Sequence, residues 1–329
     1  METTREPTTA VRPRGGPAAD PPAEHPNGQE LVERAGTEIA ALADADVAGE
    51  GDTGFEGTRL EERVIPFLRM AQGLSPQLNR SRGEYIPGLA LGDMFNTVTG
   101  EHHDGIAGVE FVACWKNYHF GVWQPRDLGG GFRGMLPPDD PLVRQTLARM
   151  AQKYGNSARF KLPRYKNGAW SDEPPRTRDG NEAVELVETG QLYVLYAPGK
   201  ITHDNYQPAI VSFTSTALPV YNAYVSSHGS KLWTQPNGQR REAKITAYRW
   251  RLATFHDKRA AGEFYNWKRI DLAVPHDFVE SRYAREDPLL FAAAEEFFEM
   301  ARGGRLKVAD SEGAGREPGD DGDAGGIPF

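Results

Sequence analysis

Aromatic and basic residues are interleaved in several runs of the chain, and this combination suits single-stranded nucleic acid. Such a strand exposes base faces and carries a phosphate at every nucleotide, so a binder needs rings for stacking beside Lys and Arg. The densest run continues through a glycine turn at residues 129–131. Its candidate contacts are Trp115, Lys116, Tyr118, Trp123, Arg126, Phe132 and Arg133.

Within this run, the two-residue repeat of a strand separates two sets of side chains. Trp115, His119 and Trp123 share one face, and Lys116, Tyr118 and Phe120 share the other. One set is expected to stack bases while the other fills the core. Each ring taken singly is expected in the core, with base stacking as its alternative.

Other basic and aromatic clusters occur later in the sequence. Arg249 and Arg251 alternate around Trp250, which places both guanidinium groups on one strand face, and we expect that face to meet the nucleic acid. The remaining candidates are Lys161, Arg164, Tyr165 and Lys166, then Lys231 and Trp233, then Trp267 and Lys268, the last pair followed by Arg269.

The segment 310–329 combines acidic residues with an apolar tip. Asp320, Asp321 and Asp323 can be steered to a basic partner surface, and Ile327, Pro328 and Phe329 offer a ring and a free carboxylate for an apolar pocket. Pro328 restricts the last residues and lowers the entropy cost of binding. We expect this tail to bind partner proteins.

Residues that could support catalysis form no recognisable arrangement. His102, His103 and Asp104 have no second cluster at metal-ligand spacing, and a turn is the expected structure there. The glycines at 129–131 lack the Lys and hydroxyl residue of a phosphate-binding loop. We therefore expect no enzyme, no metal and no cofactor.

The net charge of −8 is unevenly distributed along the 329 residues. Residues 1–57 hold 12 acidic and 4 basic residues, and residues 310–329 hold 6 and 1. The body between them therefore has 28 acidic and 33 basic residues, as phosphate binding requires. The single cysteine, Cys114, excludes an intrachain disulfide, and no apolar leader opens the sequence, so a cytoplasmic protein without membrane insertion is expected.

The tail resembles the C-terminal tip of bacterial single-stranded DNA-binding proteins, in which acidic residues precede Ile-Pro-Phe. The similarity covers about the last ten residues, and Ala324–Gly326 separate the last aspartate from Ile327. This resemblance implies recruitment of replication and recombination proteins.

The body resembles a group of phage-encoded single-stranded DNA-binding proteins with an oligonucleotide-binding-like core. Four segments carry the resemblance, namely Ile65–Pro76, Gly92–Glu101, Trp123–Gly134 and Ser212–Tyr224. The resemblance implies a class of protein and assigns no individual contact. A phage protein would act in the host cytoplasm.

The expected elements fit such a core. Residues rich in Val, Ile, Thr and aromatics predict strands, and TALPVYNAYVSSH at Thr216–His228 predicts a helix between the third and fourth strands. This order is that of a five-stranded oligonucleotide-binding (OB) barrel. The strands are Val109–Trp123, Gln191–Ala197, Ala209–Thr214, Lys244–His256 and Glu263–Val274.

Further segments surround this core. Leu136–Thr189 is a long insertion with a helix at Pro141–Tyr154 and a polar loop at Phe160–Asp179, and a last helix spans Pro288–Arg302. We divide the chain into a disordered arm with one short helix at 1–57, a β-rich α+β domain at 58–309 and a disordered tail at 310–329.

The sequence thus predicts a sequence-tolerant single-stranded DNA-binding protein that protects the strand and recruits partners through its tail. A single-strand annealing recombinase and a metal-dependent nuclease accessory are the alternatives. Stoichiometric annealing would favour the first and metal-dependent degradation the second. Assembly into a homo-oligomer is left open.

Overall fold

A computed structural model describes residues 64–155, 161–177, 180–234, 238–259, 262–273 and 282–309. All of them belong to the unit Arg59–Phe329. The predicted arm at 1–57 and the tail at 310–329 lie outside the described residues. No helix in the described segments is both long and apolar enough to span a bilayer.

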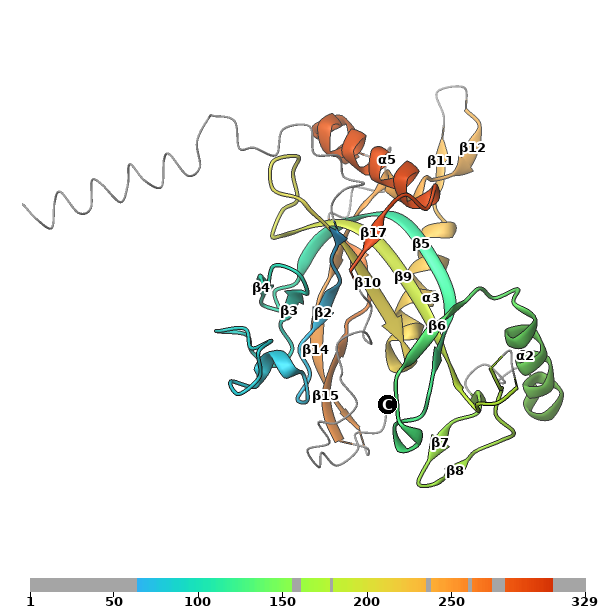
Figure 1. Ribbon diagram of the computed structural model, residues 1–329. Coiled ribbons are helices and arrows are strands. Elements are labelled where there is room, and N and C mark those ends of the chain that lie inside the picture. The colour runs from blue at the N-terminus through green and yellow to red at the C-terminus, as the bar shows by residue number, and fades with distance from the viewer. Residues whose placement is uncertain are drawn as a thin grey trace, which may run out of the picture. The chain divides into compact units, whose positions relative to one another are not determined.

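A six-stranded antiparallel sheet organises the described chain (Figure 1). Its order is β10-β9-β5-β13-β16, and β6 also pairs with β5. The strands are β5 (Val109–Trp123), β6 (Phe132–Leu136), β9 (Glu185–Pro198), β10 (Gln207–Thr214), β13 (Arg249–Leu252) and β16 (Asp271–Leu272).

β5 is the longest strand of the sheet, and two strands pair with it along the edge opposite β9. Its first residues pair with β13 and its last with β6, while β9 accompanies it from end to end. The register with β9 shifts at Cys114, where β5 carries a β-bulge. A bulge bends its strand and increases the local twist, so β5 and β9 curve across the molecule.

Helices cover both faces of the sheet. α5 (Pro288–Arg302) buries Leu290, Phe297 and Met300 against the face that carries Val112 and Cys114. α3 (Leu218–Gly229) packs on the opposite face, with Phe111 and Trp250 in the larger core. Each apolar stripe thus removes one sheet face from water.

Small elements surround this framework. β2, β3 and β4 form a sheet beside β10, β1 pairs with β17, and β14 with β15 forms a hairpin. The bounds are β1 (Val64–Ile65), β2 (Leu68–Met70), β3 (Met94–Asn96), β4 (His102–His103), β7 (Tyr165–Lys166), β8 (Ala169–Trp170), β11 (Leu232–Thr234), β12 (Arg240–Glu242), β14 (Thr254–Arg259), β15 (Gly262–Trp267), α4 (Arg282–Glu286), β17 (Lys307–Val308) and the 3-10 turns Pro76–Leu78, Arg126–Leu128, Ser215–Ala217 and Ile245–Ala247.

A β-rich domain is confirmed, but the five-stranded OB barrel is not. The expected order of three strands, a helix and two strands is present as β5, β9, β10, α3, β13 and β16. However, none of the sheets in the described part closes into a barrel. The outer side of β10 is met by Pro66 and Phe67 instead, since the Ile210 amide donates to the Pro66 carbonyl at 2.9 Å.

The expected helix at Pro141–Tyr154 is confirmed as α2 (Pro141–Tyr154), and Pro288–Arg302 is confirmed as α5. Asp140 and Asp287 cap the two helices, because their side chains accept hydrogen bonds from the amides of Leu142 and Leu290. The polar loop expected after α2 contains the short hairpin of β7 and β8, and β9 begins at Glu185, inside the expected insertion.

The last two expected strands are each broken by a bend. The stretch 244–256 divides into a 3-10 turn, β13 and β14, and residues 268–270 separate β15 from β16. The Lys268 amide still donates to the Ala253 carbonyl at 2.8 Å, so the four strands form one bent hairpin.

Candidate functional site

An open groove of about 640 Å³ lies between the β14–β15 hairpin, the start of α3 and the insertion that follows β6. Its size is typical of ligand pockets, which run to roughly 300–1,000 Å³. Its lining residues are Leu162, Arg164, Glu188, Ser215, Thr216, Leu218, Pro219, Val220, Ala223, Phe255, Asn266, Trp267 and Arg269.

The hairpin supplies the aromatic wall of the groove. Phe255 from β14 is 39% exposed, although its ring is large and apolar. Trp267 from β15 is almost buried, and its ring centroid lies 6.0 Å from that of Phe213 in the core. One wall therefore combines an accessible ring with a ring held in place by packing.

α3 forms the opposite apolar wall, and Gly190 allows its close approach to the sheet. A Cβ at Gly190 would come within 2.5 Å of the Tyr221 ring. Tyr221 in turn stacks on Tyr118 with 6.5 Å between centroids and donates a hydrogen bond to the Asn117 carbonyl. A larger residue at Gly190 would push α3 away from β9.

A buried carboxyl group lies among these apolar walls. Glu188 on β9 is 7% exposed, and the Tyr118 hydroxyl donates a hydrogen bond to its Oε1. Burial raises the pKa of Glu188 to about 7, because desolvation disfavours the charged form. The groove therefore contains a carboxyl group that changes charge near neutral pH.

Two arginines bring positive charge to the groove. Arg164 lies 3.6 Å from Glu185, and its side chain is 42% exposed. Arg269 lies 3.7 Å from Asp271 with three-quarters of its side chain in solvent. The Arg269 pair is exposed and therefore weak, and both guanidinium groups remain partly accessible to a second anion.

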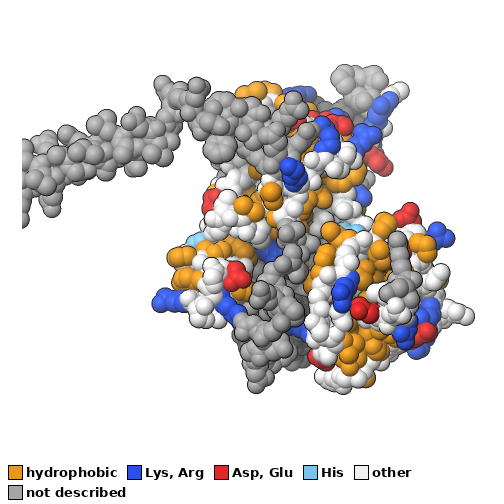
Figure 2. Space-filling model, viewed as in Figure 1, with side chains coloured by type: hydrophobic (Ala, Val, Ile, Leu, Met, Phe, Trp, Pro, Cys, Tyr) orange, Lys and Arg blue, Asp and Glu red, His pale blue; other side chains and the backbone are white. Residues whose placement is uncertain are grey.

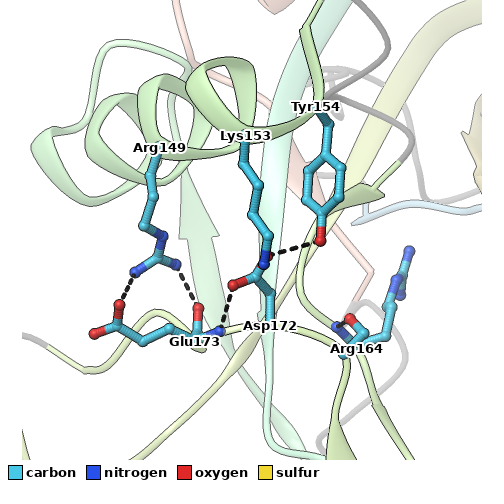
Figure 3. A network of polar contacts seen from close by, with 7 residues as sticks. Arg149, Lys153, Tyr154, Arg164, Asp172 and Glu173 are labelled. Atoms are coloured by element: carbon cyan, nitrogen blue, oxygen red, sulfur yellow. Dashed lines mark hydrogen bonds and ion pairs between the residues drawn. The ribbon is translucent and has the colours of Figure 1, made fainter.

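A polar network fixes the insertion. Lys153 and Tyr154 at the end of α2 both contact Asp172, at 2.9 and 3.0 Å, while Arg149 pairs with Glu173 (Figure 3). The Lys153 ammonium and the Glu173 amide hold the pKa of Asp172 at about 2. The insertion is thereby tied to α2 near the stretch that supplies Leu162 and Arg164.

The candidate binding residues do not form one site but lie on several parts of the molecule. Of the eighteen, Arg164 and Trp267 line the groove, and Tyr118 contacts it through Glu188. Figure 2 shows Lys and Arg side chains scattered among apolar ones on the face in view, without a single basic patch.

The run that follows β5 forms its own small surface. The Trp123 and Phe132 ring centroids lie 5.1 Å apart, and Arg126 is exposed beside the left-handed Gly129. Arg133 is paired with Glu182 at 3.2 Å. The expected glycine turn is present, since Gly129, Gly130 and Gly131 all have positive φ.

Two predictions for β13 need correction. The alternation itself is present, but the Arg249 side chain is buried against α4, 3.9 Å from Glu286 and over the Tyr283 ring. Trp250 is 1% exposed and packs in the main core. Helix α4 therefore covers Arg249 on the face that was expected to meet nucleic acid, whereas Arg251 stays exposed.

Most other candidates stay on the surface away from the groove lining. Trp115 packs edge-on against Phe298 of α5. The Lys161 ammonium lies 4.7 Å from the Tyr154 ring, and Tyr165 contacts Trp170. Exposed side chains are those of Lys116, Lys166 and Lys268.

The remaining candidate residues lie close to the edge of a described segment or beyond it. Lys231 lies over the rings of Tyr248 and Trp250. The Trp233 side chain and the tail residues Asp320, Asp321, Asp323, Ile327, Pro328 and Phe329 lie outside the described residues.

The turn expected at His102 and His103 is also wrong. The two residues form β4, paired with Met94 and Phe95 of β3. In the described segments, no group of three or more His, Cys, Asp or Glu is placed to hold a metal ion. Cys114 is buried, which raises the pKa of its thiol.

Several residues that line the groove were not selected from the sequence, among them Phe255, Asn266 and Glu188. Phe255 and Asn266 lie in two of the expected strands, but neither belongs to the basic and aromatic clusters that were selected there. Glu188 had a signal: it occupies the same face of β9 as Leu186 and Leu192, so a carboxyl group stands where the alternation calls for an apolar side chain.

A family model described as Pam3 phage gp34-like protein matches residues 34–307. The chain belongs to this family. Membership associates it with bacteriophage, as the resemblance of its body had implied, and the matched range includes every described residue that lines the groove. No curated protein and no solved structure matches the chain.

Proposed function

We propose that this phage-family protein binds single-stranded nucleic acid in the groove, without regard to sequence overall and without catalysing a reaction. One observation carries the proposal: the exposed Phe255 ring lines the same apolar groove as Arg164 and Arg269. Stacking is tolerant of sequence because every base has an aromatic face, and guanidinium groups suit phosphates.

The charge of the body supports the same proposal. Residues 58–309 carry five more basic than acidic residues despite the net charge of −8. Polar groups of Ser215, Thr216 and Asn266 at the groove add hydrogen-bonding capacity beside the apolar walls. DNA is the substrate we favour, and binding in the host cytoplasm would protect exposed strands.

Fluorescence anisotropy with labelled single-stranded and double-stranded DNA and with RNA tests the proposal. Phe255→Ala and Arg269→Ala should each weaken binding of the single strand. Leu289→Ala and Lys307→Ala are matched controls, since both residues are exposed and neither lines the groove. Binding that survives both groove substitutions, or is lost equally in the controls, would reject the groove as the site.

The segment 310–329 completes the proposal as a partner-binding element. It carries six acidic residues and one basic residue, so its charge opposes DNA phosphates and suits a basic protein surface. Deleting it should leave folding intact and hold or modestly tighten DNA binding at low salt. The same deletion should abolish capture of replication or recombination proteins in a pull-down.

Deleting Phe329 alone separates the two effects. The ring anchors a partner, whereas the aspartates carry the electrostatic competition with DNA. The shorter deletion should therefore lose partners without any gain in DNA affinity. Unfolding of the longer truncation, or loss of DNA affinity with all partners retained, would contradict this division of tasks.

A further inference from the structure

An acidic side chain is unexpected in a groove that we assign to a polyanion. Glu188 is the one carboxyl group among the described residues that line it. Its position is fixed from two sides, since β9 pairs Glu188 with Phe120 of β5 and the Tyr118 hydroxyl donates to Oε1. The carboxyl group therefore has a defined orientation at the lining of the groove.

Charged and titratable groups of several elements lie at the groove with Glu188 or contact its partner Tyr118. β5 contributes Tyr118, α3 contributes Tyr221, and the insertion contributes Arg164, which pairs with Glu185 of the same strand as Glu188. The stretch after β15 contributes Arg269. Burial raises the pKa of Glu188 to about 7.

The two forms of a carboxyl group offer different hydrogen bonds. The neutral acid has one O–H donor and an acceptor, whereas the ionised form has acceptors only. On the Watson–Crick edge, adenine, cytosine, guanine and thymine each have a donor beside an acceptor, so a neutral acid can pair with any of them. Only guanine has two adjacent donors, N1–H and the N2 amino group, which match an ionised carboxylate.

We propose that Glu188 contacts the Watson–Crick edge of a base in the groove, and that its ionisation changes base-tolerant binding into binding that prefers guanine. This inference rests on the proposed binding of single strands in the groove. Edge contacts of this kind are how unstacked bases are recognised in single strands.

Binding of oligo-dT and of an alternating dT-dG oligomer of equal length, measured from about pH 6 to about pH 8.5, tests the inference. Affinity for oligo-dT should fall roughly three- to tenfold as pH rises, the effect of losing one hydrogen bond. Affinity for the dT-dG oligomer should change less, so the ratio of the two should rise.

Two variants and one control identify the responsible group. Glu188→Gln keeps one donor and one acceptor at every pH, so its affinity ratio should stay flat. Tyr118→Phe removes a donor that favours the ionised form, so the pH midpoint should move upward. Glu182→Gln, at an exposed position outside the groove lining, should behave as wild type, and thermal unfolding checks that each variant is folded.

The outcomes separate the inference from the function on which it rests. A wild-type ratio that is constant with pH, or a ratio in Glu188→Gln that still changes with pH, overturns the role of Glu188 while binding itself stands. Failure to bind either oligomer at low salt overturns both. A midpoint unchanged in Tyr118→Phe overturns the positioning role of Tyr118.

Discussion

Two regions of the molecule have the same kind of composition and differ in access to solvent. In the core cluster of Tyr224, His228, Tyr248 and Trp250, the ring centroids lie 5.0 to 6.2 Å apart, and the Lys231 ammonium lies 5.7 Å from the Trp250 ring. The groove also joins aromatic rings with cations. Trp250 is 1% exposed, however, whereas Phe255 is 39% exposed.

The polar atoms of the core cluster make the difference clearer. Tyr224 Oη, His228 Nδ1, Tyr248 Oη and Trp250 Nε1 are buried without a hydrogen-bond partner among the described residues. Burial also lowers the pKa of His228 and raises that of Tyr224. Rings and cations in sequence therefore indicate a binding site only where the fold leaves a ring face open.

The largest effect is expected for Trp250→Ala. Removing this ring leaves a cavity in the main core, and the free energy of unfolding should fall by about 3–5 kcal/mol. Chemical denaturation measures the loss. Trp123→Ala, where the ring is half-buried against Phe132, is the comparison and should cost less. Equal losses would show that access does not separate the two rings.

Next in size is the effect of pH on Glu188→Gln. Because the pKa of Glu188 is about 7 in the folded chain and 4.5 ordinarily, the native state binds the additional proton between these values. Wild-type stability from this group therefore falls as pH rises from about 4.5 to about 7. The variant has no such loss.

Denaturation at about pH 4 and about pH 8 measures this difference. The variant should gain about 3 kcal/mol relative to wild type between the two, at 1.36 kcal/mol for each pKa unit. Glu182→Gln serves as the control at an exposed site. A gap that is the same at both pH values would mean that Glu188 titrates normally.

Phe255→Ala should act on binding alone. Loss of one stacked base weakens affinity by about 1–3 kcal/mol, while an exposed position changes stability by no more than about 0.5 kcal/mol. Paired anisotropy and denaturation measurements distinguish the two. A fall in stability without a fall in affinity would show that Phe255 has a packing role, like Trp250, and does not stack a base.

The smallest effect concerns the salt dependence of binding. With about four to six phosphate contacts, log affinity against log salt should have a slope of roughly −3 to −4, and Arg269→Ala should reduce its magnitude by about 0.7. Lys307→Ala should leave the slope unchanged. A wild-type slope near zero would remove the electrostatic basis of the comparison.

The sequence predicted local elements better than their assembly. Residue patterns located α2, α5 and β5, since helix periodicity and a run of β-branched and aromatic residues are local signals. The bends at Ala253 and residues 268–270 depend on long-range pairing, so two continuous strands were predicted instead.

The site was predicted less completely for the same reason. Arg164 and Trp267 were selected by type, but Arg249 was selected too, because nothing local to β13 shows that α4 covers it. Glu188 shows the limit in the other direction. Its position on β9 interrupts the apolar alternation, which the sequence shows. Its place in a groove depends on distant segments, which the sequence does not show.

The bulge at Cys114 bends β5 through a single inserted residue. Cys114 and Trp115 are consecutive, yet both side chains lie on the α5 side of the sheet. Cys114 is in the core beneath that helix, and Trp115 packs against Phe298. Deleting Cys114 would keep every later side chain of β5 on its present face while straightening the strand. Length variation at this position would therefore reshape the sheet gradually, whereas one residue gained or lost elsewhere in β5 would exchange its two faces.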